Sequence, residues 1–343
     1  MRILIDAMGG DNAPEAIVQG AVQAAKEYEA ELVLIGKEEK INAVLSAEGV
    51  EPGGKISVIN APDEITMEDD PATAVRRKKN SSMAVMLSML AHGEGDAAIS
   101  AGSTGALLSG ATLTVRRIPG VRRACFAPVI PNGKTGVVLA DCGANSECSP
   151  EYLLQFAHLG NIYAREIVGL PTPRVALLNI GAEDSKGGEL QKSTLALLRA
   201  EHEAGRLYFV GNIEGSEIFN DVADVVVADG FTGNVLLKSI EGTARYLLVK
   251  LKETFMQSTK NKLAALLMKN DVAALKGLMD ASEVGGTPLL GLRKPVIKAH
   301  GSTDARGVAS AVRQAIRCVE QDVVGCVERN VEFMRMDKNK EGE

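Results

Sequence analysis

The chain has 343 residues, of which 45% are hydrophobic and 24% are charged, and its formal net charge is −6. This composition is typical of a globular protein with a large core, and the negative charge and 3% aromatic content argue against a nucleic-acid binder. The five cysteines form no CxxC pair, which argues against a zinc site and favours reduced thiols in a cytoplasmic protein. No signal peptide is recognised, and no apolar run reaches the ~20 residues of a membrane span.

The N-terminal segment predicts a βαβ unit, the building block of a parallel sheet. A buried strand at 3–5 is followed by a helix at 15–28 and a strand at 32–35. The loop DAMGGD lies at the carboxyl end of the first strand, where parallel sheets bind ligands. We therefore expect Asp6, Gly9 and Gly10 to approach a substrate. A Gly-Gly turn with helix-capping carboxylates is the structural alternative.

Four consecutive cations follow, namely Arg76, Arg77, Lys78 and Lys79, in a chain that is acidic overall. A solvated helix face is the ordinary explanation for such a run. A docking surface for a polyanionic partner is the functional alternative.

The next strand, at 97–99, leads into a turn of small residues and then into a helix. Gly102, Ser103, Thr104 and Gly105 would offer backbone N–H groups, hydroxyls and the positive end of a helix dipole to an anion. A plain Gly/Ser turn would have the same sequence, so the motif alone does not decide between them.

Two later strands end in similar loops, DCGAN and GAEDSKGG. Cys142 in the first has no histidine nearby in the sequence, which favours a packed thiol over a nucleophile. Lys186 in the second stands among glycines and acids, so we expect it to reach an anion as a point charge. A solvated surface lysine is the alternative.

Two further loops carry candidate catalytic groups. Asn234, in DGFTGN, has an amide N–H suited to an oxyanion, although it could also be a helix cap. His300 follows the strand at 295–299 and could act as an acid, a base or a phosphate contact.

A region at 242–282 has leucines at helical spacing and interleaved lysines, which predicts an amphipathic helical hairpin with a turn at 269–271. Two roles for this hairpin remain as alternatives. It could form a dimer contact or cover the core, or it could be a surface that contacts a lipid chain or a bilayer. The side chains expected to contact lipid are Leu263, Leu266, Leu267, Leu275, Leu278 and Met279.

Taken in order, these motifs resemble one family over nearly the whole chain, from residue 1 to about 327. The motifs that carry the resemblance are DAMGGD, AVRRKKNSSM, ISAGSTGALL, NIGAEDSKGGEL, DGFTGNV and PVIKAHGSTDARG. The chain is similar to the bacterial phosphate acyltransferases of phospholipid synthesis, which transfer an acyl group from acyl carrier protein to phosphate.

This resemblance implies a three-layer α/β/α fold with a mainly parallel sheet, similar to phosphotransacetylase and isocitrate-dehydrogenase-like folds, with a protruding helical hairpin. It implies a homodimer without a metal or nucleotide cofactor. The reversible reaction would convert acyl-[acyl carrier protein] and inorganic phosphate into acyl phosphate for a membrane-bound glycerol-3-phosphate acyltransferase. We expect one domain at 1–335 and a charged tail at 336–343, in a cytoplasmic protein, and the hairpin leaves peripheral membrane attachment open.

Within this resemblance, Lys186, Asn234 and His300 are the expected catalytic residues, and the loops at 6–10 and 102–105 are expected to bind phosphate or substrate. The basic run at 76–79 would dock the acidic carrier protein. Two other functions remain. The first is a phosphotransacetylase that uses a short acyl-coenzyme A, and the second is a non-catalytic scaffold for lipid enzymes.

Overall fold

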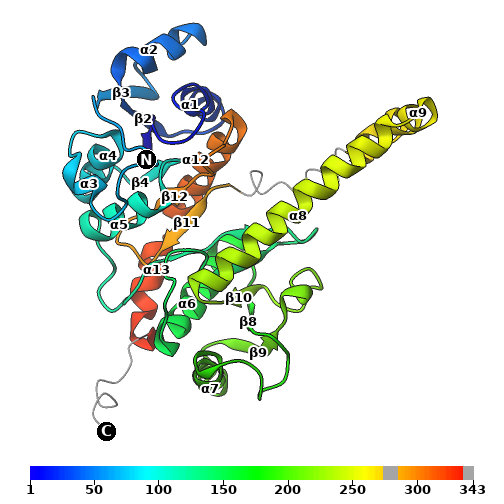
Figure 1. Ribbon diagram of the computed structural model, residues 1–343. Helices are drawn as coiled ribbons and strands as arrows, with labels where there is room; N and C mark the ends of the chain where they lie inside the picture. The colour runs from blue at the N-terminus through cyan, green and yellow to red at the C-terminus, as the bar shows by residue number, and fades with distance from the viewer. Residues whose placement is uncertain (273–284, 335–343) are drawn as a thin grey trace.

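The computed structural model describes residues 1–272 and 285–334, which form two β-sheets (Figure 1). The larger sheet has the order β3-β2-β1-β4-β12-β11-β5; its first five strands are parallel, and β11 is antiparallel to both neighbours. Its strands, in that order, are Ile56–Asn60, Glu31–Gly36, Arg2–Asp6, Ala97–Ser100, Val296–Lys298, Thr287–Leu290 and Cys125–Phe126. The carboxyl ends of β1, β4 and β12 therefore lie side by side at one edge.

The smaller sheet has the order β6-β7-β10-β8-β9, and all of its strands except β6 are parallel. Its strands, in that order, are Val129–Ile130, Val137–Ala140, Val225–Val227, Arg174–Leu178 and Tyr208–Ile213. The loops that contain Cys142, Lys186 and Asn234 consequently leave the same edge of this sheet.

Helices cover both faces of the sheets, because neighbouring strand residues point to opposite sides. Ile3 and Ile5 of β1 belong to one buried cluster with α1 and α12, while Leu4 belongs to another with α4 and α5. This arrangement confirms the predicted three-layer α/β/α fold. The helices are α1 Glu15–Glu27, α2 Glu38–Ala47, α3 Ala74–Arg77, α4 Ser82–Ala91, α5 Thr104–Thr114, α6 Pro150–Tyr163, η1 Ala164–Val168, α7 Glu189–Glu203, η2 Gly215–Glu217, α8 Gly230–Met256, α9 Thr259–Leu267, α12 Ala305–Glu320, α13 Val323–Asn330 and η3 Val331–Met334.

Both buried clusters contain residues of both sheets. Ile3 of the larger sheet shares a cluster with Val138 of the smaller one, and Leu4 shares the other with Leu139. We propose on this ground that residues 1–335 form a single domain, with 242–282 as a helical insertion. The tail at 336–343 lies outside the described residues.

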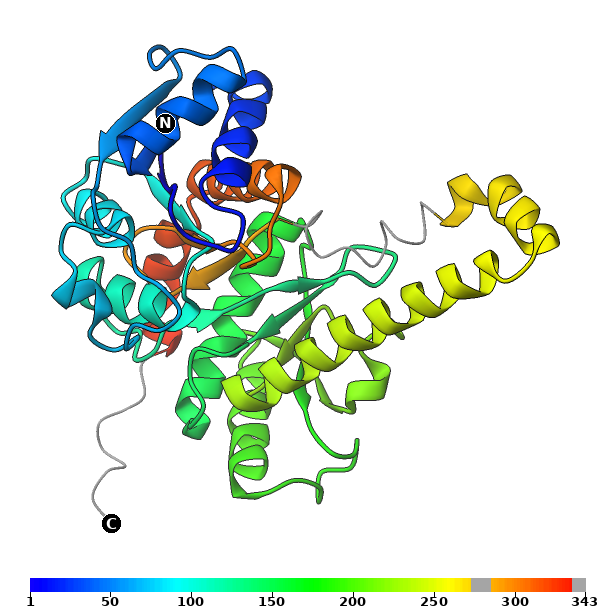
Figure 2. The same ribbon diagram turned by 45° about the horizontal axis from the view of Figure 1, so that its top comes forward.

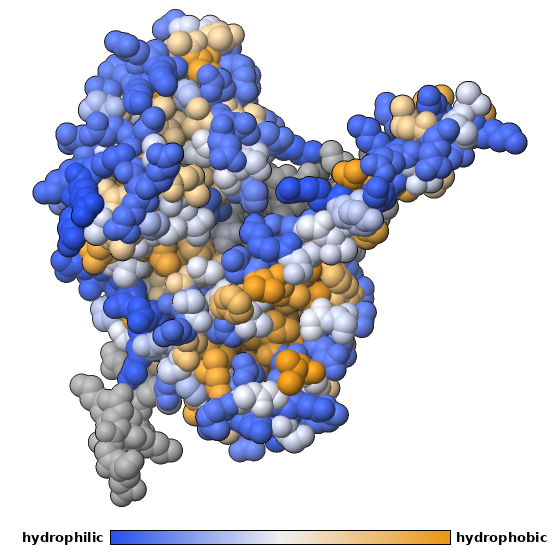
Figure 3. Space-filling view, viewed as in Figure 1, coloured by the Kyte–Doolittle hydropathy of each residue, from blue (hydrophilic) through white to orange (hydrophobic). Residues whose placement is uncertain are grey.

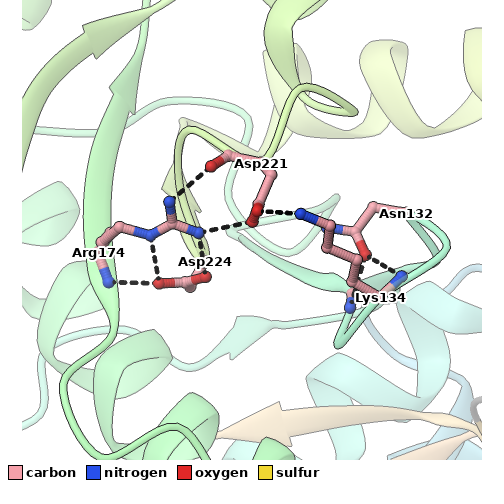
Figure 4. Close-up of polar contacts among 6 residues, drawn as sticks. Asn132, Lys134, Arg174, Asp221 and Asp224 are labelled. Carbon is pink, nitrogen blue, oxygen red and sulfur yellow. Dashed lines mark hydrogen bonds and ion pairs between the residues drawn. The ribbon is translucent and has the colours of Figure 1, made fainter.

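A network of charges ties the smaller sheet together at the edge opposite the loops of interest (Figure 4). Arg174, at the start of β8, donates from Nε and Nη2 to the two carboxylate oxygens of Asp224 at 2.9 and 2.8 Å, and from Nη2 to Asp221 at 2.7 Å. Lys134 binds Asp221 from the other side. The strand β10 begins at Val225, directly after Asp224, which is held in this network.

The helices α8 and α9 project from the body as an arm (Figures 1 and 2). The turn predicted at 269–271 is displaced by one residue, because α9 ends at Leu267, Met268 forms a turn and residues 269–272 are helical. The chain also breaks its helix earlier, at 257–258. Ser258 causes this break, because its hydroxyl accepts the N–H of Asn261 at 3.1 Å and so caps a new helix. Leu275, Leu278 and Met279 lie outside the described residues.

No helix in the described part of the chain is both long and apolar enough to cross a bilayer.

Candidate active site

Three of the predicted loops meet at the edge formed by β1, β4 and β12. The Ser100 hydroxyl donates to Oδ2 of Asp6 at 2.6 Å and accepts the N–H of Gly102 at 3.0 Å. The N–H of Asp11 donates to the carbonyl of Gly301 at 2.8 Å. The loops after all three strands are thus joined by hydrogen bonds, as expected for neighbouring parallel strands.

The two glycines of the first loop are required by this close approach. A Cβ on Gly9 would lie 2.6 Å from Oδ2 of Asp6 and 2.7 Å from the nitrogen of Gly102. Gly10 has a φ of +106°, which side chains rarely adopt. The absence of side chains at Gly9 and Gly10 therefore has a physical reason in the close approach of the two loops, and their predicted contact with a substrate stays a prediction.

The turn after β4 begins α5, as predicted. The Ser103 hydroxyl accepts the N–H of Ala106 at 3.4 Å and is buried, so it serves first as the helix cap. Thr104 is exposed. A Cβ on Gly105 would lie 2.7 Å from the side chain of Pro71, which explains that glycine by packing. Of these residues, Thr104 presents the most accessible hydroxyl.

Lys298, at the end of β12, is a candidate that the sequence did not single out. Its ammonium group donates to the carbonyl of Ala101 at 3.3 Å and to that of Ala299. Burial lowers the pKa of Lys298 to about 8, although the nearby Asp6 carboxylate opposes that shift. A lysine of this kind is a common feature of functional sites.

His300 lies two residues after Lys298 and is held by its own loop. Its Nδ1 accepts the backbone N–H of Ser302 at 3.3 Å and lies 3.0 Å from the Ser302 hydroxyl. Burial, and after it the charge of Lys238, lowers the pKa of His300. The imidazole is therefore neutral near pH 7, and its proton is on Nε2, because Nδ1 acts as an acceptor.

Asn234 lies in the first turn of α8, beside the loop that follows β7. Its side chain is 3.6 Å from where a Cβ of Gly143 would be. Asp141 holds this loop, since its buried carboxylate accepts the N–H of Cys142 at 2.7 Å and that of Asn145 at 2.7 Å. Burial raises the pKa of Asp141 to about 6, against these hydrogen bonds. Two of the predicted loops of the smaller sheet thus lie in contact.

One face of α8 connects the two groups of loops. Asn234, Lys238, Glu241 and Arg245 are spaced by four, three and four residues and so share a helix face. The charges of Lys238, Glu241 and Arg245 all act on His300. Figure 1 shows α8 starting beside β10 and passing between the parts of the molecule that hold the two sheets. The candidate site therefore has two walls, one from each sheet.

Comparisons with known proteins show the family to which this chain is similar. The family model described as "Fatty acid synthesis protein" matches residues 1–325. A phosphate acyltransferase of Clostridioides difficile is 45% identical over 345 residues, covering all of both chains. One of Geobacillus thermodenitrificans is 48% identical over 335 residues, covering 97% of this chain and 99% of the relative.

The chain belongs to the phosphate acyltransferase family. Acyl transfer is thus its class of chemistry, and the chain is an enzyme. Among solved structures, a phosphotransacetylase from Streptococcus pyogenes has a TM-score of 0.62 at 17% identity, covering 95% of this chain and 94% of its own. One from Staphylococcus aureus has a TM-score of 0.60 at 17% identity, covering 94% of each. The fold of the family member described here is thus of the phosphotransacetylase kind.

Lys186 is the predicted catalytic residue that is least tied to the others. It is exposed, its N–H donates to the carbonyl of Glu183 at 3.1 Å, and its carbonyl accepts from Asn179 at 3.2 Å. Among the described residues, no hydrogen bond or ion pair joins it to Asn234 or His300. Its loop nevertheless leaves β8, the direct neighbour of β10, at the same sheet edge as Asn234.

The Cys142 thiol is a packed group. It is 8% exposed, and burial raises its pKa to about 12, so the thiol is protonated near neutral pH. A covalent role for this residue in the family's chemistry is disfavoured. Among the described residues, no cluster of three or more His, Cys, Asp or Glu side chains could hold a metal ion.

The basic run is not uniform. Arg76, Arg77 and Lys79 are exposed, but Lys78 turns inward and donates to the carbonyl of Glu64 at 3.1 Å and to Asp69 at 2.7 Å. Lys78 therefore holds a loop in place, and three of the four predicted cations are presented to solvent.

Proposed function

We propose that this enzyme reversibly transfers a fatty acyl group from acyl-[acyl carrier protein] to inorganic phosphate, giving acyl phosphate for phosphatidic acid and phospholipid synthesis. The observation that carries the proposal is the face of α8 on which Asn234 and Lys238 stand, because its charges act on His300 at the opposite wall. This places an amide donor and basic groups on the helix face whose charges reach the neutral imidazole, and the substrates of such a transfer would meet there.

The chemistry assigns a role to each group. A phosphate oxygen attacks the thioester carbonyl carbon, a C–O bond forms, and the carbonyl oxygen becomes an oxyanion that the amide of Asn234 stabilises. The C–S bond then breaks, Nε2–H of His300 donates a hydrogen bond to the departing thiolate of the carrier protein, and the thiolate takes the proton that the attacking hydrogen phosphate gives up on becoming acyl phosphate. Lys186 orients phosphate as a point charge, and the turn at 102–105 holds an anion at the start of α5.

Substitutions test the roles proposed for Asn234 and Lys186. Asn234→Ala should lower kcat by about 100- to 1,000-fold, the typical effect of losing one oxyanion donor, and Lys186→Ala should also collapse turnover. Lys192→Ala is a matched control, because Lys192 is an exposed lysine on the next helix, α7. Near-wild-type rates in both test variants, with folding intact, would refute these assignments.

The acyl donor separates this function from its alternatives. Acyl phosphate formation is measured with long-chain acyl-[acyl carrier protein] and with acetyl-coenzyme A under the same conditions. We expect preference for the carrier-bound acyl group. Preference for acetyl-coenzyme A would support a phosphotransacetylase, and a lack of product with both donors would support a scaffold.

The carrier protein and the membrane each need a binding surface on the enzyme, and two sets of exposed residues are candidates for these surfaces. Arg76, Arg77 and Lys79 carry the exposed positive charge that an acidic carrier protein needs. Leu266 and Leu267 on α9 are 68% and 78% exposed, as expected for side chains that contact a lipid chain or a bilayer. A membrane-bound glycerol-3-phosphate acyltransferase would then receive acyl phosphate at that surface.

A homodimer is the proposed assembly. Figure 3 shows an apolar area over the start of α8 and the smaller sheet, and Ile180, Phe231 and Val235 are exposed hydrophobic residues of these elements. Light scattering of Phe231→Asp should give a monomer if this area is the interface. An unchanged dimer mass would place the interface elsewhere.

A further inference from the structure

The peptide group between Ala101 and Gly102 is held at both ends. Its carbonyl accepts from the ammonium of Lys298 at 3.3 Å, and its N–H donates to the Ser100 hydroxyl at 3.0 Å. That hydroxyl in turn donates to Asp6 at 2.6 Å. The backbone of β12 closes the arrangement, because the N–H of Ala299 donates to the carbonyl of Ser100 at 3.0 Å. A single peptide orientation is therefore enforced where the strand β4 passes into the turn before α5.

The Asp6 carboxylate is the buried centre of this arrangement, with 1% of its surface exposed. Ser82 of α4 also bonds to it, and the N–H of Met8 donates to Oδ1 at 3.3 Å. Burial raises the pKa of Asp6, whereas its hydrogen bonds and the charge of Lys298 favour the ionised form. The other charged or titratable groups that face this place are Asp11 and His300 on the adjoining loops and Lys238, Glu241 and Arg245 on α8.

We propose that Asp6, Ser100 and Lys298 are positioning residues that clamp the turn at 100–105 in the orientation that receives phosphate. This inference rests on the proposed function, because it concerns how the phosphate-binding turn is held. None of the three groups needs to touch a reacting atom. Their task is to aim the backbone N–H groups of the turn, which removes the cost of ordering them when the anion arrives.

The charge of Lys298 matters because the 2.6 Å hydrogen bond from Ser100 is charge-assisted. Such bonds are about twice as strong as neutral ones, so the clamp is strongest while Asp6 is ionised. Removing the lysine charge makes ionisation of the buried carboxyl less favourable. The pH below which Asp6 takes up a proton should then rise, and the turn should loosen over that range.

The test compares full-length variants in the acyl phosphate assay with phosphate as the varied substrate. Lys298→Met should lower kcat/KM for phosphate by about 100-fold, the effect of a displacement of ~1 Å, and should move the acid limb of the pH profile to higher pH. Lys298→Arg should retain most of the activity. Lys294→Met is the matched control, because Lys294 lies just before β12, at its other end, and it should leave the rate unchanged.

A double variant distinguishes positioning from direct contact with phosphate. Asp6→Asn keeps a hydrogen-bond acceptor for Ser100 but removes the buried charge, so adding it to Lys298→Met should recover part of the lost rate. No recovery would overturn the clamp, since it would mean that the ammonium itself binds the anion. An unchanged rate and pH profile for Lys298→Met would overturn it as well.

Two further measurements keep the test decisive. Ser100→Ala breaks the hydrogen-bonded link between Asp6 and the turn while keeping the Lys298 charge, so it should lower the rate, and it replaces Lys298→Met if that variant does not fold. Inorganic phosphate alone should raise the melting temperature of the wild type more than that of the variants. A wild type that makes no acyl phosphate refutes the proposed function, whereas an active wild type with wild-type-like variants refutes only the clamp.

Discussion

Gly9→Ala is the smallest change that tests how tightly the first loop must approach the turn at 100–105, which we propose binds phosphate. The added methyl group would lie 2.6 Å from Oδ2 of Asp6, 2.7 Å from the nitrogen of Gly102 and 3.0 Å from Oγ of Ser100. Two of these distances are shorter than any that real Cβ atoms adopt. Because the nearest atoms belong to the backbone and to a hydrogen-bonded carboxylate, the loop rather than a flexible side chain has to move.

The size of the effect follows from these distances. Carbon contacts are most favourable at about 3.5 Å or more, so the loop at residue 9 and the turn at residue 102 must separate by about 0.8 Å. Overpacking of this kind costs about 1–3 kcal/mol of folding free energy. A displacement approaching 1 Å at a binding site also costs up to about 100-fold in rate. We therefore expect a moderate loss of stability and a larger loss of activity.

Urea unfolding and the acyl phosphate assay measure the two effects separately. Gly242→Ala is the control, because a Cβ there meets nothing within 4 Å and Gly242 lies within α8, where alanine is favoured by up to about 1 kcal/mol. The reasoning is refuted if Gly9→Ala keeps both the wild-type free energy of unfolding and the wild-type KM for phosphate. A loss of stability without any loss of activity would refute the link between the loop and the site.

Three other changes have measurable outcomes. Reversing the charges of Arg76 and Lys79 to Glu should raise the KM for the carrier protein and flatten its salt dependence, and an unchanged KM excludes docking there. Replacing Leu266 and Leu267 by Ser should reduce vesicle binding without changing the free energy of unfolding, and unreduced binding rejects a membrane role for α9. Glu201→Gln should lower the free energy of unfolding by about 3 kcal/mol at pH 7. The reason is that hydrogen bonds from Arg206 and His158 overcome the effect of burial and lower the pKa of Glu201 to about 2. The stabilisation by ionised Glu201 is fully present above pH ~4.5 and is lost as the pH falls through about 2. Measuring the free energy of unfolding of the wild type and of Glu201→Gln as the pH is lowered checks this.

Much of the larger sheet's site could be predicted from the sequence, because strand ends are visible in it. An apolar run that stops at Asp6 or at Gly102 marks a strand end, and parallel strands end at a common edge. The meeting of the loops after β1, β4 and β12 follows from that rule. The division into two sheets does not, since β5 and β6 have only two residues each and show no alternation.

Lys298 and Lys238 could not be predicted for a different reason. A lysine at the end of the strand at 295–299 has the same pattern as any edge residue, and only the tertiary fold shows its ammonium between two carbonyl groups. The importance of Lys238 can be recognised only once α8 is known to begin at Gly230 and to bring its charged face near His300. For Lys78 the sequence predicted a functional role that the structure does not support, because a run of cations does not show which one turns inward to bind Asp69.

The surroundings of His300 indicate that hydrogen bonding to the leaving group and neutralisation of the anion are carried out by different residues. Burial and then the charge of Lys238 lower its pKa, so the imidazole is uncharged near neutral pH and cannot serve as a standing cation for phosphate. Its Nδ1 already accepts the N–H of Ser302, which leaves Nε2–H as a hydrogen-bond donor to a leaving thiolate. We therefore expect the anion to be held by basic side chains, such as those of Lys238 and Arg245 on α8. A neutral histidine close to cations is thus consistent with a reaction in which the imidazole donates a hydrogen bond to the leaving thiolate, while the negative charge is neutralised by other residues.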